Sequence, residues 1–151
     1  MRARSMKIID MAVQHVAVIH TGVSVLECAK RMRSEHVGSL VVVDADNKPI
    51  GMLTDRDITL EVTALEKNPK ELLVENVMSS PVSVAQCTES VVDALARMRE
   101  QGIRRLPVVD DKGILCGIVT ASNLVEEITE MLDSIVRAVK SSKTRETALR
   151  P

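Results

Sequence analysis

The stretch GMLTDRDI at residues 51–58 returns further along the chain as GIVTASNL at residues 117–124. In each stretch a short apolar run meets a threonine, Thr54 or Thr120, whose hydroxyl can cap the start of a helix. In the first stretch Asp57 stands three positions after the threonine and completes a capping box. The pair of stretches therefore predicts a strand that runs directly into a helix, present twice in the chain.

The offset that carries Gly51 onto Gly117, here called the repeat offset, holds over most of the chain without a gap. RMR at residues 31–33 matches 97–99, and LVVVD at 40–44 matches LPVVD at 106–110. Each unit of about 60 residues is too small to bury much surface alone, so we expect each to cover the apolar face of the other. We predict domains at residues 6–68 and 69–140, divided where Asn68-Pro69 breaks a helical pattern.

The composition narrows the class of protein. The chain has 151 residues, of which 45% are hydrophobic and none is aromatic, so a core must be built from aliphatic side chains and methionine. Single-stranded nucleic acids stack on aromatic side chains, and duplex DNA needs a basic surface, whereas the net charge here is −1. No apolar run is long enough to span a membrane, and no signal-peptide pattern opens the chain. We expect a cytoplasmic protein that binds neither nucleic acid nor membrane.

Neither cysteine nor histidine occurs in a ligand pattern. Three cysteines and three histidines are scattered without C-x-x-C or paired-histidine spacing. The sequence therefore predicts no disulfide framework and no metal site.

The hydrophobic patterns predict the elements of a mixed α/β (α+β) fold. In the first unit we expect strands at 15–19, 38–44 and 50–53, a helix that starts at Thr21 or Ser24, and a helix at 55–66. In the second unit we expect strands at 82–84, 103–109 and 114–119 and a helix at 90–101 that is ended by Gly102. That helix is expected to turn Val91, Leu95 and Met98 inward.

A long final helix is predicted from Ser122 to about Lys140. Its apolar positions form a stripe that continues beyond the repeated unit: Leu124, Ile128, Met131, Leu132, Ile135 and Val139. Such a stripe needs a cover, which is either the other unit or a second chain. Residues 141–151 are polar and charged, and we expect a disordered tail there.

Taken with GIRRLPVVD at 102–110, these motifs resemble a tandem pair of cystathionine-β-synthase (CBS) domains, a Bateman module, over roughly residues 15–130. The resemblance implies two β-α-β-β-α units related by a pseudo-two-fold axis, often paired into a homodimer. It also implies clefts between the domains that bind AMP, ADP, ATP or related adenosine compounds. By the same resemblance Asp57 would hold the ribose, Thr54 would lie near the phosphate, and Arg104 and Arg105 would hold phosphates.

The chemistry of these residue types suits those roles. A carboxylate accepts strong hydrogen bonds from ribose hydroxyls, and adjacent arginines offer fork-shaped donors to phosphate. A helix start also suits a phosphate, because its amide groups are unpaired. We expect adenine to lie among aliphatic side chains. The remaining candidates for the nucleotide site are Met52, Arg56, Ser83, Val84 and Ile103.

The second cleft departs from the family's pattern. It would be built from Thr120, Asn123 and residues Val37, Gly38 and Ser39. Asn123 stands at the position of Asp57, and Gly38 and Ser39 stand at the positions of Arg104 and Arg105. This cleft lacks both the carboxylate and the basic pair, so we expect one competent cleft.

Plainer interpretations stay open for the same residues. Thr54 and Asp57 can act only as a capping box, and the two arginines can be solvated or paired with Asp93 or Glu100. We expect a non-catalytic regulatory protein that binds an adenine nucleotide as its regulatory ligand, needs no catalytic cofactor and acts on an unidentified effector protein. The alternative is a structural dimerisation scaffold with empty clefts. An enzyme is disfavoured, because no nucleophile–base set or Gly-rich phosphate loop is present.

Overall fold

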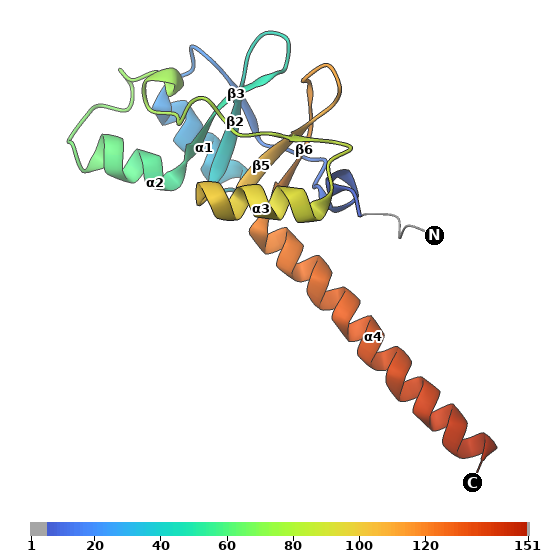
Figure 1. Cartoon of the computed structure of the whole chain (residues 1–151). Helices are drawn as coiled ribbons and strands as arrows, with labels where there is room; N and C mark the ends of the chain where they lie inside the picture. Colours follow the sequence, from blue (N-terminus) through green and yellow to red (C-terminus); the bar gives the residue numbers. More distant parts are fainter. Residues whose placement is uncertain (1–5, 151) are drawn as a thin grey trace.

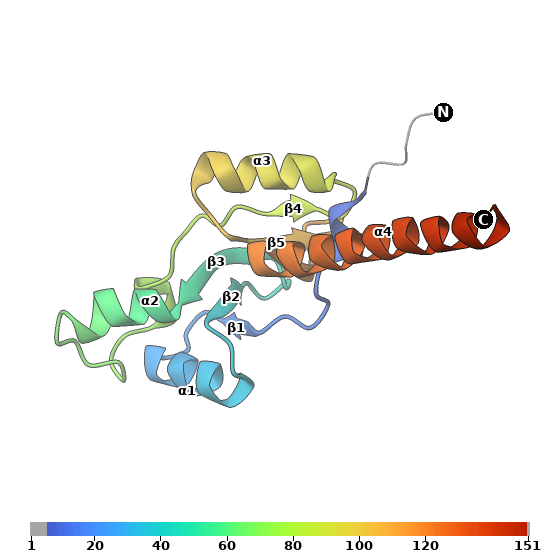
Figure 2. The ribbon, with the colours of Figure 1, turned by 90° about the horizontal axis from the view of Figure 1, so that it is seen from below.

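A computed structural model describes residues 6–150 and shows two small sheets side by side, each with helices, and one helix that projects far from them (Figures 1 and 2). The elements in chain order are η1 (Ile8–Met11), β1 (Val18–His20), α1 (Val25–Glu35), β2 (Ser39–Val43), β3 (Pro49–Thr54), α2 (Asp55–Ile58), η2 (Thr59–Thr63), η3 (Val74–Asn76), β4 (Ala85–Gln86), α3 (Val91–Gln101), β5 (Arg105–Val109), β6 (Leu115–Thr120) and α4 (Ala121–Leu149).

The two sheets repeat one another strand by strand. In each, the first strand is parallel to the central strand and the third is antiparallel to it, in the orders β1-β2-β3 and β4-β5-β6. Leu40 pairs with Leu53 in the first sheet, and Leu106 pairs with Val119 in the second. Even the irregularity of the register recurs, after Val42 in the first sheet and after Val108 in the second. The predicted repeat and its pseudo-two-fold relation are confirmed.

Helices α1 and α3 obey the repeat offset and bury one face each. Their N-terminal caps are Ser24 and Ser90, whose hydroxyls accept hydrogen bonds from the third amide of each helix. Both helices end on a left-handed residue, His36 with φ 54° and Gly102 with φ 65°. In α3 the buried residues are Val91, Ala94 and Met98. The prediction that Leu95 points inward is wrong, because the buried face passes through Ala94 and leaves Leu95 at its edge.

The two cores are closed by an exchange of short segments. Ile8 of η1 lies in the core of the second repeat, with Leu106 and Val119, and its amide donates to Glu89 O at 2.8 Å. Val74 of η3 lies in the core of the first repeat, and its amide donates to Val23 O at 2.8 Å. Each repeat therefore supplies the piece that covers the other, which is how two units of this size bury enough apolar surface.

The exchanged segments explain the two repeated glycines. After η3 the chain crosses β3, where Ser79 bridges to Met52, and after η1 it crosses β6, where Val13 bridges to Ile118. A Cβ on Gly51 would lie 2.5 Å from Met78 Sδ and 3.0 Å from Ser79 O. Gly51 therefore gives the crossing segment room to touch the strand.

Several predicted boundaries are wrong. The first strands of the two sheets begin later than predicted, at Val18 and Ala85, because only the residues opposite the central strand form ladder hydrogen bonds. The helix predicted over 55–66 is α-helical only as far as Ile58 and continues as the π-helical turn η2 to Thr63.

Helix α4 is longer than the sequence predicted. It contains 29 residues and ends at Leu149 instead of near Lys140, so the tail expected to be disordered is helical as far as Leu149, while Pro151 lies outside the described residues. No Gly or Pro occurs in α4 and it is rich in good helix formers, so nothing ends it earlier. Within 6–150 no helix is both long and apolar enough to cross a membrane.

The three cysteines are free thiols. Cys28 is fully buried in the first core, while Cys87 and Cys116 are half-buried beside the second, with their sulfur atoms 2.8 Å apart.

Candidate functional site

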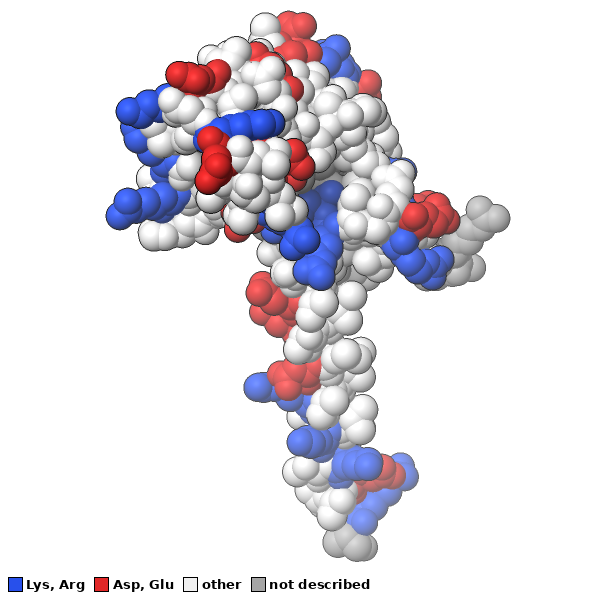
Figure 3. Space-filling model, turned by 90° about the vertical axis from the view of Figure 1, so that its left-hand side faces the viewer, with Lys and Arg blue, Asp and Glu red and all other residues white. Residues whose placement is uncertain are grey.

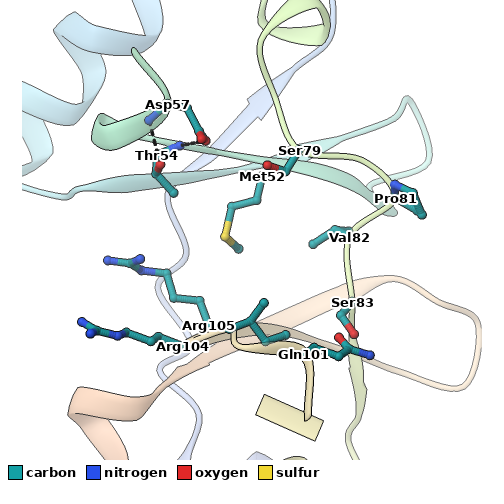
Figure 4. A pocket seen from close by; sticks show the side chains of 11 residues that line it. Met52, Thr54, Asp57, Ser79, Pro81, Val82, Ser83, Gln101, Arg104 and Arg105 are labelled. Atoms are coloured by element: carbon teal, nitrogen blue, oxygen red, sulfur yellow. Dashed lines mark hydrogen bonds between the residues drawn. The ribbon is translucent and has the colours of Figure 1, made fainter. Parts of the chain in front are cut away.

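A cleft of about 370 Å³ lies between the two repeats (Figure 4). Most of the residues that line it were predicted for the nucleotide site, and the rest were not. The predicted ones are Met52, Thr54, Asp57, Ser83, Ile103, Arg104 and Arg105. The others are Ser79, Pro81, Val82 and Gln101.

One wall of the cleft is the junction between β3 and α2. Thr54 Oγ1 accepts a hydrogen bond from the Asp57 amide at 3.1 Å, and Asp57 Oδ2 accepts one from the Thr54 amide at 2.8 Å. This reciprocal capping box is the one predicted. It fixes the half-buried carboxylate at the edge of the cleft, and within residues 6–150 no hydrogen bond reaches its Oδ1 atom. The hydroxyl proton of Thr54 is likewise left to donate.

The helix start itself offers little to an anion. The Asp55 amide donates to Gly38 O at 2.9 Å, and the Arg56 amide donates to Asp55 Oδ1 at 2.8 Å. The Asp57 amide is taken by Thr54, so the first three amides of α2 all have acceptors. The expectation that the amides at this helix start are unpaired is therefore wrong.

The facing wall carries the two arginines. Arg105 begins β5 and is half-buried, whereas Arg104 is exposed and its carbonyl accepts the Ala121 amide at 2.8 Å. Figure 4 shows both side chains on the opposite side of the cleft from Thr54 and Asp57. In the part of the chain that the structure describes, neither arginine forms an ion pair, so the alternative pairing with Asp93 or Glu100 is not found. Two positive charges are therefore available to a ligand.

Two predicted residues lie away from the cleft. Arg56 is an exposed residue of α2 and does not line it. Val84 does not line it either, and its carbonyl accepts a hydrogen bond from the Arg97 guanidinium, which also pairs with Glu89 at 2.6 Å. The apolar lining comes instead from Met52, Pro81, Val82 and Ile103.

The sequence did not predict that Ser79, Pro81, Val82 and Gln101 line the cleft, and the reason is physical. The segment before β4 follows the cleft because it crosses β3 at Ser79, and that crossing is a tertiary contact without a local pattern. Gln101 is the last residue of α3. The repeat held a usable signal for the crossing, since Ser79 corresponds by the repeat offset to Val13, which crosses β6.

The equivalent position in the other repeat has different chemistry. The Thr120 hydroxyl accepts from the Asn123 amide at 3.1 Å and also donates to Asn123 Oδ1 at 2.6 Å, so its proton is used. Gly38 stands at the position that corresponds to Arg104, and a Cβ there would lie 3.1 Å from Asp55 Oδ2. The carboxylate of Asp55 therefore lies close to the position that corresponds to Arg104, and a negative charge there disfavours a phosphate. Val37 and Ser39 beside it are half-buried.

The arrangement of the first cleft suits an anionic ligand with hydroxyl groups. A carboxylate oxygen and a hydroxyl proton lie on one side, two guanidinium groups lie on the other, and aliphatic side chains lie between. No cluster of three or more His, Cys, Asp or Glu side chains that could hold a metal occurs between residues 6 and 150.

Comparisons with known proteins agree with this architecture. The chain is 34% identical to an uncharacterized protein of Methanopyrus kandleri, over 91% of this chain and 70% of that one. It is 30% identical to a homoserine O-acetyltransferase of Methanohalobium evestigatum, over 78% of this chain but only 24% of the enzyme. Among solved structures, the CBS domain pair of protein MJ0100, in complex with 5′-methylthioadenosine and S-adenosyl-L-methionine, superposes with a TM-score of 0.73. That structure is 28% identical and covers 84% of this chain and 98% of its own.

A model of the CBS domain matches the chain twice, at residues 8–63 and 74–130. These matches contain both sheets and both capping threonines, and they agree with the repeat of the two sheets. The chain belongs to the CBS-domain family and contains two CBS domains in tandem.

Proposed function

We propose that this protein is a regulatory, non-catalytic module that binds an adenosine derivative of the AMP, ADP or ATP type in the cleft between its repeats. The observation that supports the proposal is that Asp57 and Thr54 from one repeat and Arg104 and Arg105 from the other line the same cleft. A similar CBS pair, that of protein MJ0100, is known in complex with two adenosine compounds. The volume of about 370 Å³ is within the usual range for small-molecule sites.

In the proposed complex each wall has its own task. Asp57 keeps its Oδ2 atom in the capping box and offers Oδ1 to the ribose hydroxyls. The Thr54 hydroxyl and the guanidinium groups of Arg104 and Arg105 hold the phosphate. Adenine lies among Met52, Val82 and Ile103, where burial of its faces favours binding. Charge-assisted hydrogen bonds of this kind contribute about 1.5–3 kcal/mol each.

Regulation follows from the ligand touching both repeats. A ligand that contacts Asp57 on one side and Arg105 on the other favours the arrangement of the repeats in which both contacts are made. We propose that an effector protein responds to this shift. The groups in the cleft are a carboxylate, hydroxyls and guanidinium groups arranged for binding, and no role in bond making or breaking is assigned to them.

Isothermal titration calorimetry with AMP, ADP, ATP, S-adenosylmethionine and 5′-methylthioadenosine tests the proposal. We expect at least one compound to bind, and we expect Asp57→Asn to weaken it about tenfold or more through loss of a charged acceptor. Asn123→Ala is the matched control, because Asn123 occupies the equivalent position of the other repeat. Absence of heat with every compound contradicts the proposal, as does equal binding by the Asp57→Asn variant.

A dimerisation scaffold is the second candidate function, and one observation favours it. Helix α4 leaves eight large hydrophobic side chains between 38% and 70% exposed. If the protein is only a scaffold, Asp57→Asn leaves its behaviour unchanged, whereas substitutions on α4 abolish its self-association.

A further inference from the structure

The projecting part of α4 carries an apolar face that the rest of the described chain does not cover. Only Leu124, next to the body, is buried, at 2% exposure. The exposed residues of this face, here called the α4 stripe, are Val125, Ile128, Met131, Leu132, Ile135, Val136, Val139 and Leu149. They extend over about 36 Å of helix at about 1.5 Å per residue. An apolar face of this length marks an interaction surface.

The charges of α4 are divided between its two halves. Residues 121–135 contain four acids and no base: Glu126, Glu127, Glu130 and Asp133. Residues 136–150 contain five bases and one acid, and the bases are Arg137, Lys140, Lys143, Arg145 and Arg150. Figure 3 shows acids gathered on the part of the helix nearest the body and bases gathered toward its tip. The charges of α4 are therefore complementary to those of a second α4 that runs in the opposite direction.

From these two observations we infer that two copies of the protein pair through the α4 stripe in an antiparallel orientation. A parallel pair would set acidic half against acidic half and basic half against basic half. An antiparallel pair sets each acidic half against the partner's basic half and brings the two stripes together. The pair is isologous, with its two-fold axis near Ile135 and Val136, so one surface serves both copies.

The flanks of the stripe support this orientation. Glu127 and Arg145 are separated by about five complete turns of an α-helix, so they lie on the same flank of α4. In a two-fold antiparallel pair the same flanks of the two helices meet. Glu127 of each copy then lies close to Arg145 of the other copy. Both ends of the pair gain this contact.

The arrangement has a consequence for the clefts. Helix α4 is about 43 Å long at about 1.5 Å per residue, so an antiparallel pair holds the two bodies at opposite ends of a shared stem. The inference rests on self-association, which is the second candidate function, and is independent of ligand binding.

Light scattering after size-exclusion chromatography tests whether the stripe mediates association. We expect the complete chain to have the mass of a dimer and Ile135→Asp to have the mass of a monomer. Ser134→Asp is the matched control, because it adds the same charge at the neighbouring, off-stripe position and is expected to remain a dimer. Circular dichroism checks that both variants keep their helices. A monomeric parent protein, or a dimeric Ile135→Asp variant, overturns the inference.

Spin labels at Thr147→Cys test the orientation, in a chain that also carries Cys87→Ser and Cys116→Ser. With the axis near Ile135, the antiparallel pair puts the two labels about 35 Å apart, whereas a parallel pair puts them about 10 Å apart. A separation near that longer distance supports the inference. A short separation in a confirmed dimer overturns the antiparallel orientation while leaving self-association intact. Calorimetry with the adenosine compounds reports on the ligand proposal separately.

Discussion

Asp57 and Asn123 occupy the same place in the two repeats but make different hydrogen bonds. Asp57 Oδ2 accepts from the Thr54 amide at 2.8 Å, whereas Asn123 Oδ1 accepts from the Thr120 hydroxyl at 2.6 Å. The first arrangement leaves a hydroxyl proton and a carboxylate oxygen facing the cleft, and the second consumes its hydroxyl proton internally. The two repeats have nearly the same fold, but only the first offers a free hydroxyl proton and a free carboxylate oxygen to a ligand.

This difference predicts separate effects on stability and on binding. Asp57→Ala removes one partner of the capping box and is expected to lower the free energy of unfolding by about 1 kcal/mol. Asp57→Asn keeps a side-chain oxygen for the cap and is expected to cost less, while it still removes the charge offered to the ligand. Urea denaturation measures the first effect and calorimetry the second. Equal stability of the Asp57→Ala variant and the parent protein would show that the cap contributes nothing.

The crossing of β3 by the segment after η3 predicts a strong effect at Gly51. A methyl group there meets Met78 Sδ at 2.5 Å and Ser79 O at 3.0 Å, so the segment must move away. We expect Gly51→Ala to lower the free energy of unfolding by about 1–3 kcal/mol. Gly22→Ala is a useful comparison, because no atom lies within 4 Å of the added carbon and only the backbone at φ +82° is strained. The prediction fails if Gly51→Ala is as stable as the parent protein.

The left-handed residues that end α1 and α3 predict that glycine is favoured at both positions. His36 is held at φ 54° and Gly102 at φ 65°, and a side chain in this region costs about 1–2 kcal/mol. We expect His36→Gly to raise the thermal midpoint and Gly102→Ala to lower it. A smaller effect of His36→Gly is expected, because glycine also gains freedom in the unfolded chain. Calorimetric melting of both variants checks the signs, and a lower midpoint for His36→Gly contradicts the prediction.

The buried thiol of the first core predicts a loss of stability in alkali. Burial raises the pKa of Cys28 from 9.0 to about 11. Between these values the unfolded chain loses the thiol proton while the folded chain keeps it, so the free energy of unfolding falls as the pH rises. This thiol contributes a slope of up to about 1.4 kcal/mol per pH unit.

That contribution is measured by urea denaturation of the parent protein and of Cys28→Ala at a series of pH values. The series runs from below the ordinary pKa of a thiol up to about pH 11. The variant is expected to be less stable throughout, because a buried sulfur is lost, but to show a shallower decline. Parallel curves for the two proteins contradict the assignment.

The sequence predicted most of the fold because the repeat supplied each element twice. The bounds of α1 and α3, and those of β2 and β5, are related by the same offset that relates Gly51 to Gly117. A local pattern also predicted the capping box of Thr54 and Asp57, whereas the roles of Arg104 and Arg105 were implied by the resemblance to CBS domains. The predictions that were wrong concern features that depend on contacts between residues distant in sequence, such as the start of β4 and the position of Val84.

The exchange of η1 and η3 belongs to that second group. Nothing in the residues around Ile8 or Val74 indicates that each enters the core of the opposite repeat. The extension of α4 to Leu149 differs from the expectation for another reason. A polar composition is typical of disorder, but these residues are also good helix formers.

Ile8 and Val74 each lie in the core of the opposite repeat, and this has a consequence for how the protein unfolds. A fragment that stops after the first repeat would keep Ile8 but lack the Val74 that seals its own interior, and a fragment that begins at the second would be short of Ile8. Neither half is a self-sufficient module, so heat or denaturant is expected to melt both in a single transition.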